Sequence, residues 1–220
     1  MLFLVLLAVF AQVKVGCSNP RIRKEIRSLS AQEWQKVKNA MHEMKKRGIM
    51  RKFSTIHNQF FSRFHNNVYF LSWHREFIWN FEQEMRKIDS SVTLPYWNWA
   101  RDADQLKWNF DKTEVWSNKY LGTVSPNTCI KGGIFDYNVV NYPFKHCISR
   151  RLRRDILPSG GSTVASIVAT PYGIEYFSKL IESGPHALFH MHIGGDMGVG
   201  YSTNDIVFYF HHAFIDYVIF

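Results

Sequence analysis

Apolar residues recur at helical spacing in the first part of the chain. Ser30 and Glu33 have the spacing of a capping box, a signature of a helix start. The apolar positions that follow it up to Gly48 recur every three or four residues and are Trp34, Val37, Met41 and Met44. A second apolar face consists of Phe77, Phe81, Met85 and Ile88. We therefore predict one helix from Ser30 to Gly48 and another from about Trp73 to Asp89.

Three further helices are predicted near the end of the chain. Thr170-Pro171 has the pattern of an N-cap followed by proline at the first helical position, and predicts a helix through Glu182 that stops at Gly184-Pro185. A short helix is expected over residues 186–191. Ser202 and Asp205 indicate the start of a last helix, from Asp205 to Phe220, that is apolar nearly all round and therefore central to the core.

Between Asn98 and Pro171 the periodicity fails, and Gly, Pro, Asn and Ser accumulate. This stretch is predicted to be a long connection. Cys129 and Cys147 bracket part of it, and we expect them to form a disulfide in an oxidising compartment, which leaves Cys17 over. The pattern as a whole predicts a mainly α fold.

Length and composition favour one domain, because 220 residues with 46% hydrophobic content can bury a single core. Residues 1–11 form an apolar run that we interpret as a secretory signal, although an uncleaved anchor or a buried strand would give the same pattern. Residues 12–29 form a basic segment, and residues 30–220 the folded domain. The net charge of +9 comes largely from basic clusters that we interpret as solvated faces, since no nucleic-acid motif or transmembrane span accompanies them.

Histidines gather in two segments. The first contains His57, His65 and His74, and the second contains His186, His190, His211 and His212. His186 and His190 stand at i and i+4, so that both imidazoles leave one helix face about one turn apart. Two histidines on an amphipathic helix are often only surface residues. Six imidazoles in two sets can also hold two ions, and imidazole suits copper, zinc, iron and nickel.

The residues around these histidines resemble the two copper segments of the tyrosinase and molluscan-type haemocyanin family. The first match comprises His65, Phe70-Leu71-Ser72-Trp73-His74-Arg75, Glu82 and Leu94-Pro95-Tyr96-Trp97-Asn98-Trp99. The second comprises Gly184-Pro185-His186, His190, Gly194-Gly195-Asp196-Met197, Asn204-Asp205, Phe208, His211-His212 and Asp216. The resemblance covers roughly residues 30–220 and implies a four-helix core around a dinuclear copper site.

Carried over residue by residue, the resemblance implies that one copper ion is held by His57, His65 and His74. The other is held by His186, His190 and His212. His42 is the alternative to His57 as a ligand of the first copper ion. Neighbours on a helix diverge by about 100°, so only one residue of the pair His211 and His212 should face the site. His146 and His192 are expected to have no role in it.

The resemblance also implies roles for two carboxylates, Glu182 and Asp216. Glu182 lies four residues before His186, where family enzymes carry a glutamate that orients a water and could help take a phenolic proton, although a surface position is equally consistent. Asp216 either orients His212 or forms an ordinary salt bridge.

The resemblance implies a secreted enzyme that uses dioxygen to oxidise o-diphenols to o-quinones, acting on small phenols or tyrosyl side chains. The alternatives are a dioxygen carrier and a matrix protein whose site has decayed. The sequence departs from the family pattern at Ala187, where many hydroxylating members have asparagine, at Ile206, where proline is common, and at Tyr217, where arginine is common. It also stops at Phe220, within the last predicted helix, so an incomplete domain is expected.

Overall fold

The computed structural model describes residues 20–124, 129–135 and 139–219. The predicted signal segment and Cys17 lie outside these residues. The described part of the chain is mainly helical, as the periodicity predicted, and its one sheet has two short antiparallel strands, β1 (Val139–Val140) and β2 (His146–Cys147).

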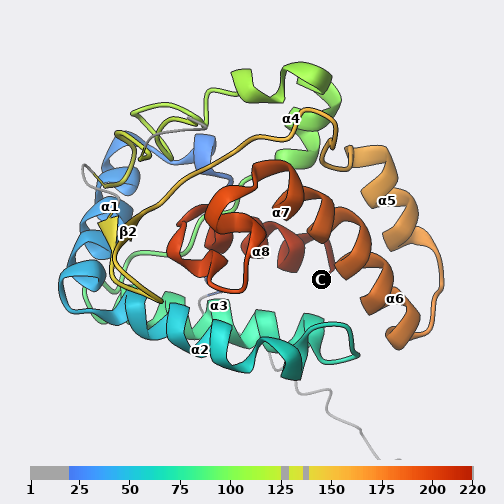
Figure 1. Ribbon diagram of the computed structural model, residues 1–220, viewed down its shortest axis with the longest axis horizontal. Coiled ribbons are helices and arrows are strands. Elements are labelled where there is room, and N and C mark those ends of the chain that lie inside the picture. The colour runs from blue at the N-terminus through green and yellow to red at the C-terminus, as the bar shows by residue number, and fades with distance from the viewer. Residues whose placement is uncertain (1–19, 125–128, 136–138, 220) are drawn as a thin grey trace, which may run out of the picture.

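The first three helices form one side of the molecule. Helix α1 (Ala31–Lys46) begins with the predicted capping box, in which the Ser30 hydroxyl and the Glu33 carboxylate each accept a hydrogen bond from the other residue's backbone N–H. Gly48, at a φ of 73°, turns the chain into α2 (Ile49–Phe64). Helix α3 (Phe70–Arg86) runs beside α2 along the lower edge of the molecule (Figure 1).

The middle of the chain contains more helix than its composition predicted. Helix α4 (Trp99–Leu106) starts at the Asn98 side chain, which accepts from the Arg101 N–H, and α5 (Gly161–Ala169) follows the connection. The expectation of one long connection from Asn98 to Pro171 was therefore wrong at both ends, where α4 and α5 lie. The Cys129–Cys147 disulfide is present, with its Cα atoms 5.1 Å apart. Further 3-10 turns cover Ile26–Ser28, Lys107–Lys112, Gly195–Gly198 and Ser202–Asn204.

The predicted helix from Thr170 starts later than expected. Thr170 ends α5, and Gly173 precedes α6 (Ile174–Ile181), so Pro171 lies in the link between two helices. Gly184-Pro185 does interrupt the helix, as predicted: α6 ends at Ile181, and Gly184 has non-helical backbone angles (φ −97°, ψ −105°). A kinked turn with π-helical hydrogen bonds (Glu182–His186) then leads into α7 (Ala187–Ile193), the short helix expected over residues 186–191.

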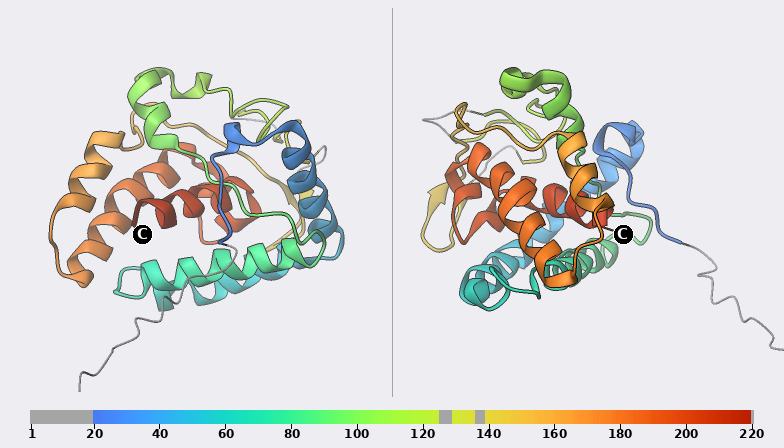
Figure 2. Two further views of the ribbon diagram at one scale, coloured as in Figure 1. Left: turned by 180° about the vertical axis from the view of Figure 1, so that it is seen from behind. Right: turned by 90° about the vertical axis from the view of Figure 1, so that its right-hand side faces the viewer.

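Helix α8 (Val207–Ile219) lies at the centre of the fold, with the other helices around it (Figures 1 and 2). Its residues 207–215 are all buried, as its apolar sequence predicted. The helix starts two residues later than expected, and the Asp205 carboxylate accepts the backbone N–H of Val207. No helix of the described residues is long and apolar enough to cross a membrane.

Three arginines of the basic clusters are not on solvated faces, which corrects the interpretation of those clusters. Arg23 pairs with Glu82, and Arg27 pairs with Asp102. Arg150 is 1% exposed and binds both carboxylate oxygens of Asp205 at 2.7 Å; it also donates to the Leu121 carbonyl.

Candidate metal centre

The first histidine group is assembled by α2 and α3. His57 lies on α2, His65 is the residue that ends α2, and His74 lies on α3. Each of the three offers a ring nitrogen, and these nitrogens all lie within 4.8 Å of one another. The structure therefore brings together the predicted set, with His57 and not its alternative His42.

The second group is assembled by the π-helical turn, α7 and α8. His186, His190, His211 and His212 each offer a ring nitrogen within 4.8 Å of the others. The expectation that only one of the pair His211 and His212 faces this group was therefore wrong. The two groups are adjacent, because the rings of His74 and His212 stack at 4.3 Å between centroids.

Hydrogen bonds fix the ring tautomers of five of these histidines. In each, Nδ1 faces an oxygen that can only accept, so Nδ1 carries the proton and Nε2 keeps its lone pair. The acceptors are Gly200 O for His57 (2.7 Å), Glu182 Oε1 for His65 (2.8 Å), Phe70 O for His74 (2.8 Å), Glu182 O for His186 (3.0 Å) and Met197 O for His190 (2.6 Å). All five Nε2 atoms are buried and have no hydrogen-bond partner in the described part of the chain.

An unpaired buried nitrogen is costly, and one metal ion in each group would satisfy all five. In His211 and His212, neither ring nitrogen has a partner among the described residues. The His211 ring also stacks on Phe189, with centroids 4.4 Å apart and an interplanar angle of 7°. The donor set of lone pairs on neutral imidazoles fits copper.

Burial keeps six of these imidazoles neutral, those of His57, His74, His186, His190, His211 and His212. It lowers the pKa of His57 to about 3 and that of His190 to about 4. Burial first, and neighbouring imidazoles second, lower the pKa well below its ordinary value in His74, His186, His211 and His212. A neutral ring is the form that binds a metal.

A cavity of about 370 Å³ opens onto both groups and is lined by His57, His65, His186 and His190. Glu182, 6% exposed, also lines it. Its Oε1 accepts from His65 Nδ1 and from the Asn66 backbone N–H, both at 2.8 Å, and its Oε2 lies 3.0 Å from the same N–H. Glu182 therefore orients His65, and it is not a surface residue.

Three candidates lie elsewhere. His42 contacts the edge of the Phe135 ring and belongs to neither group. His192 donates to the Ile156 carbonyl and packs against Phe110, also outside both groups. Asp216 does not orient His212, because its carboxylate pairs with Arg23 at 2.9 Å and with Arg75 at 3.4 Å.

The loop from Gly194 to Ser202 positions the centre, and the sequence analysis missed its role. Its Met197 carbonyl orients His190 in one group, and its Gly200 carbonyl orients His57 in the other. Backbone carbonyls leave no signature in a sequence. The one available signal was Gly194-Gly195, where a Cβ on Gly195 would lie 2.1 Å from the Ser149 carbonyl oxygen.

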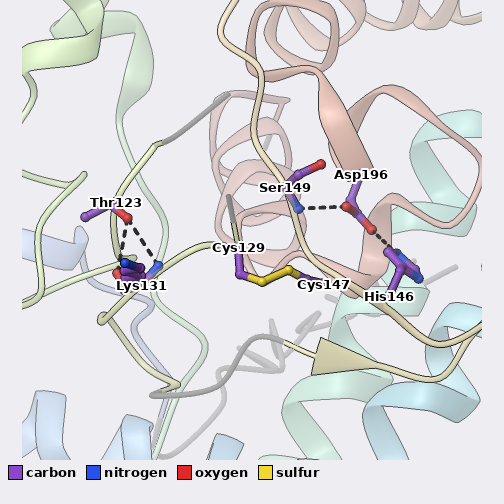
Figure 3. Close-up of a disulfide and its surroundings, with 7 residues drawn as sticks. All are labelled: Thr123, Cys129, Lys131, His146, Cys147, Ser149 and Asp196. Carbon is purple, nitrogen blue, oxygen red and sulfur yellow. Dashed lines mark hydrogen bonds and ion pairs between the residues drawn. A yellow bond between two sulfur atoms is a disulfide. The ribbon is translucent and has the colours of Figure 1, made fainter. Parts of the chain in front are cut away.

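Asp196 fastens this loop beside the disulfide (Figure 3). Its carboxylate accepts from His146 Nε2 at 2.7 Å and from the Ser149 N–H at 2.9 Å, and Cys147 lies between these two residues in the sequence. His146 Nδ1 donates to the Phe144 carbonyl. Burial alone would lower the pKa of His146, but the hydrogen bonds to Asp196 and Phe144 raise it, so the pair has ionic character.

The sequence model of the common central domain of tyrosinase matches residues 32–163 and 159–220 of the chain. The chain belongs to the tyrosinase family. It is 30% identical to the tyrosinase of Streptomyces antibioticus, over 89% of this chain and 80% of that protein. It is 29% identical to the putative tyrosinase-like protein tyr-3 of Caenorhabditis elegans, over 89% of this chain and 30% of that protein.

Two solved structures share the fold. A polyphenol oxidase from Thermothelomyces thermophila superposes with a TM-score of 0.67 at 21% identity, over 89% of this chain and 68% of that one. A functional unit of octopus hemocyanin superposes with a TM-score of 0.62 at 18% identity, over 90% of this chain and 51% of that one. Both confirm the predicted fold class. The family binds a dinuclear copper centre, and the two histidine groups could hold metal ions.

Proposed function

We propose that this chain is a secreted copper oxidoreductase that oxidises o-diphenols to o-quinones with dioxygen. In this proposal His57, His65 and His74 hold one copper ion, and His186, His190 and His212 hold the other. The observation that carries it is the set of five buried histidines whose Nε2 lone pairs are unpaired, with Nδ1 fixed as the donor. When bound, the copper pair supplies the redox chemistry by which dioxygen oxidises a phenol.

The adjacent cavity favours an enzyme. Its volume of about 370 Å³ lies in the range of small-molecule sites, and it reaches histidines of both groups, so a phenol can approach the metals. The exposed apolar side chains at its rim are Phe61, Met191 and Val199, which suit an aromatic ring. The disulfide supports secretion, since such bonds persist in oxidising compartments.

Glu182 would have two tasks in this reaction. It holds His65 in the orientation and tautomer that a metal requires, by accepting from Nδ1. It also keeps a carboxylate in the cavity, and Oε2, with a single contact of 3.0 Å, retains the capacity to accept a proton from a phenolic hydroxyl.

The test measures metal content and turnover in the same preparation. Chain secreted from a eukaryotic host and loaded with copper is expected to contain two copper ions per chain by mass spectrometry of the metal. It should also consume oxygen with 4-tert-butylcatechol, and the quinone should be trapped as a coloured adduct. His74→Ala and His190→Ala should each lower the copper content, whereas His42→Ala, outside both groups, should not. One copper ion per chain, or retention of zinc in place of copper, contradicts the proposal.

The dioxygen carrier stays a second candidate because the fold also superposes on a hemocyanin unit. It predicts the same copper content with reversible oxygen binding and no consumption of the catechol. Oxygen uptake that depends on the catechol therefore separates the two candidates.

A further inference from the structure

The cavity at the histidine groups has an unbalanced lining. Among the described residues that line it, none is a lysine or an arginine, and the one acidic residue is Glu182. The other polar groups, besides the histidines, include Asn66, Ser183 and Ser202. Away from the metal-binding histidines, the ring substituent of a bound phenol therefore meets apolar and neutral side chains and one carboxylate.

From this lining we infer that the site selects phenols whose ring substituent carries no carboxylate. The inference rests on the proposed function and specifies its substrate class. Free tyrosine and free dopa carry a carboxylate, whereas the same ring in a peptide has that carbon in a neutral amide. The expected substrates are therefore tyrosyl or dopa residues in peptides, and other phenols without an acid group.

The physical reason is the cost of bringing a carboxylate to the outer part of the cavity, where no lysine or arginine side chain among the described lining residues can pair with it. A carboxylate loses water there, and a charged group without an ionic partner is penalised more than a neutral one. The Glu182 carboxylate repels it at close range in addition. A neutral amide loses less on the same transfer.

The apolar rim strengthens this selection, because it holds the substituent of a bound ring. Phe61, Met191 and Val199 line the cavity and are 39%, 40% and 42% exposed. These side chains give contact area to a neutral chain and no hydrogen-bond donor to a carboxylate. The net charge of +9 attracts anions from a distance, but salt at 0.15 M screens such forces beyond about 8 Å.

The test compares two catechols that differ only at the acid group, N-acetyldopa and N-acetyldopa methylamide, at 0.15 M salt. The methylamide is expected to have a kcat/KM higher on the order of tenfold, the penalty of one partly desolvated, unpaired carboxylate. Equal values for the two substrates in the unaltered protein overturn the inference while leaving the proposed function intact.

A rim variant tests the cause of the preference. Met191→Arg places a cation at the rim. It should reduce the ratio of kcat/KM for the methylamide to kcat/KM for the acid roughly fivefold, the effect of one partly exposed ion pair. Met191→Gln, of similar length and uncharged, is the matched control and should keep the ratio of the unaltered protein. If the two variants give the same ratio with the copper content of the unaltered protein, the inference is wrong.

Failure of the proposed function can be distinguished from failure of this inference. If neither catechol is oxidised, that function fails, and the preference is then measured as binding. Calorimetry should give tighter binding of N-acetyltyrosine methylamide than of N-acetyltyrosine to the metal-loaded chain. Equal affinities, or tighter binding of the acid, overturn the inference.

Discussion

Glu182 offers the sharpest test of how the protein holds its metal centre. Glu182→Ala removes the acceptor of two buried donors, His65 Nδ1 and the backbone N–H of Asn66, each 2.8 Å from Oε1. His65 then loses the bond that fixes its tautomer. Glu182→Gln keeps an oxygen that can accept both bonds, but it has no negative charge and cannot take up a proton.

The expected magnitudes follow from these contacts. Each donor left without a partner costs about 1–3 kcal/mol of stability. Loss of the group that orients a metal-binding histidine lowers metal affinity about 10- to 100-fold. Glu182→Ala should therefore bind copper that much more weakly. Glu182→Gln should stay within about tenfold of the unaltered protein in affinity but lose turnover, because general-base help contributes about 10²–10⁴-fold to a proton transfer.

The assay is a copper competition titration with a chromogenic chelator, followed by oxygen uptake with 4-tert-butylcatechol on fully loaded protein. Glu175→Ala is the control, since Glu175 lies on α6, the helix that leads into the turn with Glu182, and is exposed. If Glu182→Ala binds copper as tightly as Glu175→Ala, the positioning role is refuted. If loaded Glu182→Gln turns over as fast as the unaltered protein, the proton-accepting role is refuted.

Three further outcomes are expected. Asp196→Asn weakens the bond to His146 and should lower the affinity for copper, although no metal-binding histidine is changed. Asp155→Asn, in an exposed ion pair, is the control and should keep the affinity of the unaltered protein. Equal copper affinities of the two variants would contradict the role of Asp196. Arg150→Ala leaves Asp205 charged and buried, and should lower the free energy of unfolding in urea by about 3–5 kcal/mol; a loss below 1 kcal/mol would contradict it. Ala187→Asn adds a polar group to the cavity lining and should raise the rate with 4-tert-butylphenol relative to 4-tert-butylcatechol; an unchanged ratio would show that this position does not limit hydroxylation.

The sequence predicted the elements whose signals are local. The capping box at Ser30, the apolar face of α3 and the all-apolar α8 were each visible in the order of residues. The i, i+4 spacing of His186 and His190 and the family motifs located six candidate ligands, which the structure gathers into two adjacent groups. These features depend on short stretches of chain.

The errors arose where longer-range contacts decide. Thr170-Pro171 has the chemistry of a helix start, yet Thr170 ends α5, whose short sequence of small and β-branched residues has no strong helical signal. Gly184-Pro185 does break the helix as predicted, but the sequence did not show that the break is a kinked π-helical turn that holds His186. The role of Arg150 could not be predicted, because its partner Asp205 lies 55 residues away.

The loop from Gly194 to Ser202 couples the two halves of the centre thermodynamically. Its carbonyls orient one histidine in each group, so a metal ion that binds in either group restrains the same stretch of backbone. The first ion to bind then meets most of the entropic cost of ordering that stretch, and the second meets less, which is positive cooperativity without any direct contact between the ions. Copper loading should accordingly favour empty and doubly filled chains over singly filled ones, as native mass spectrometry during a titration can resolve.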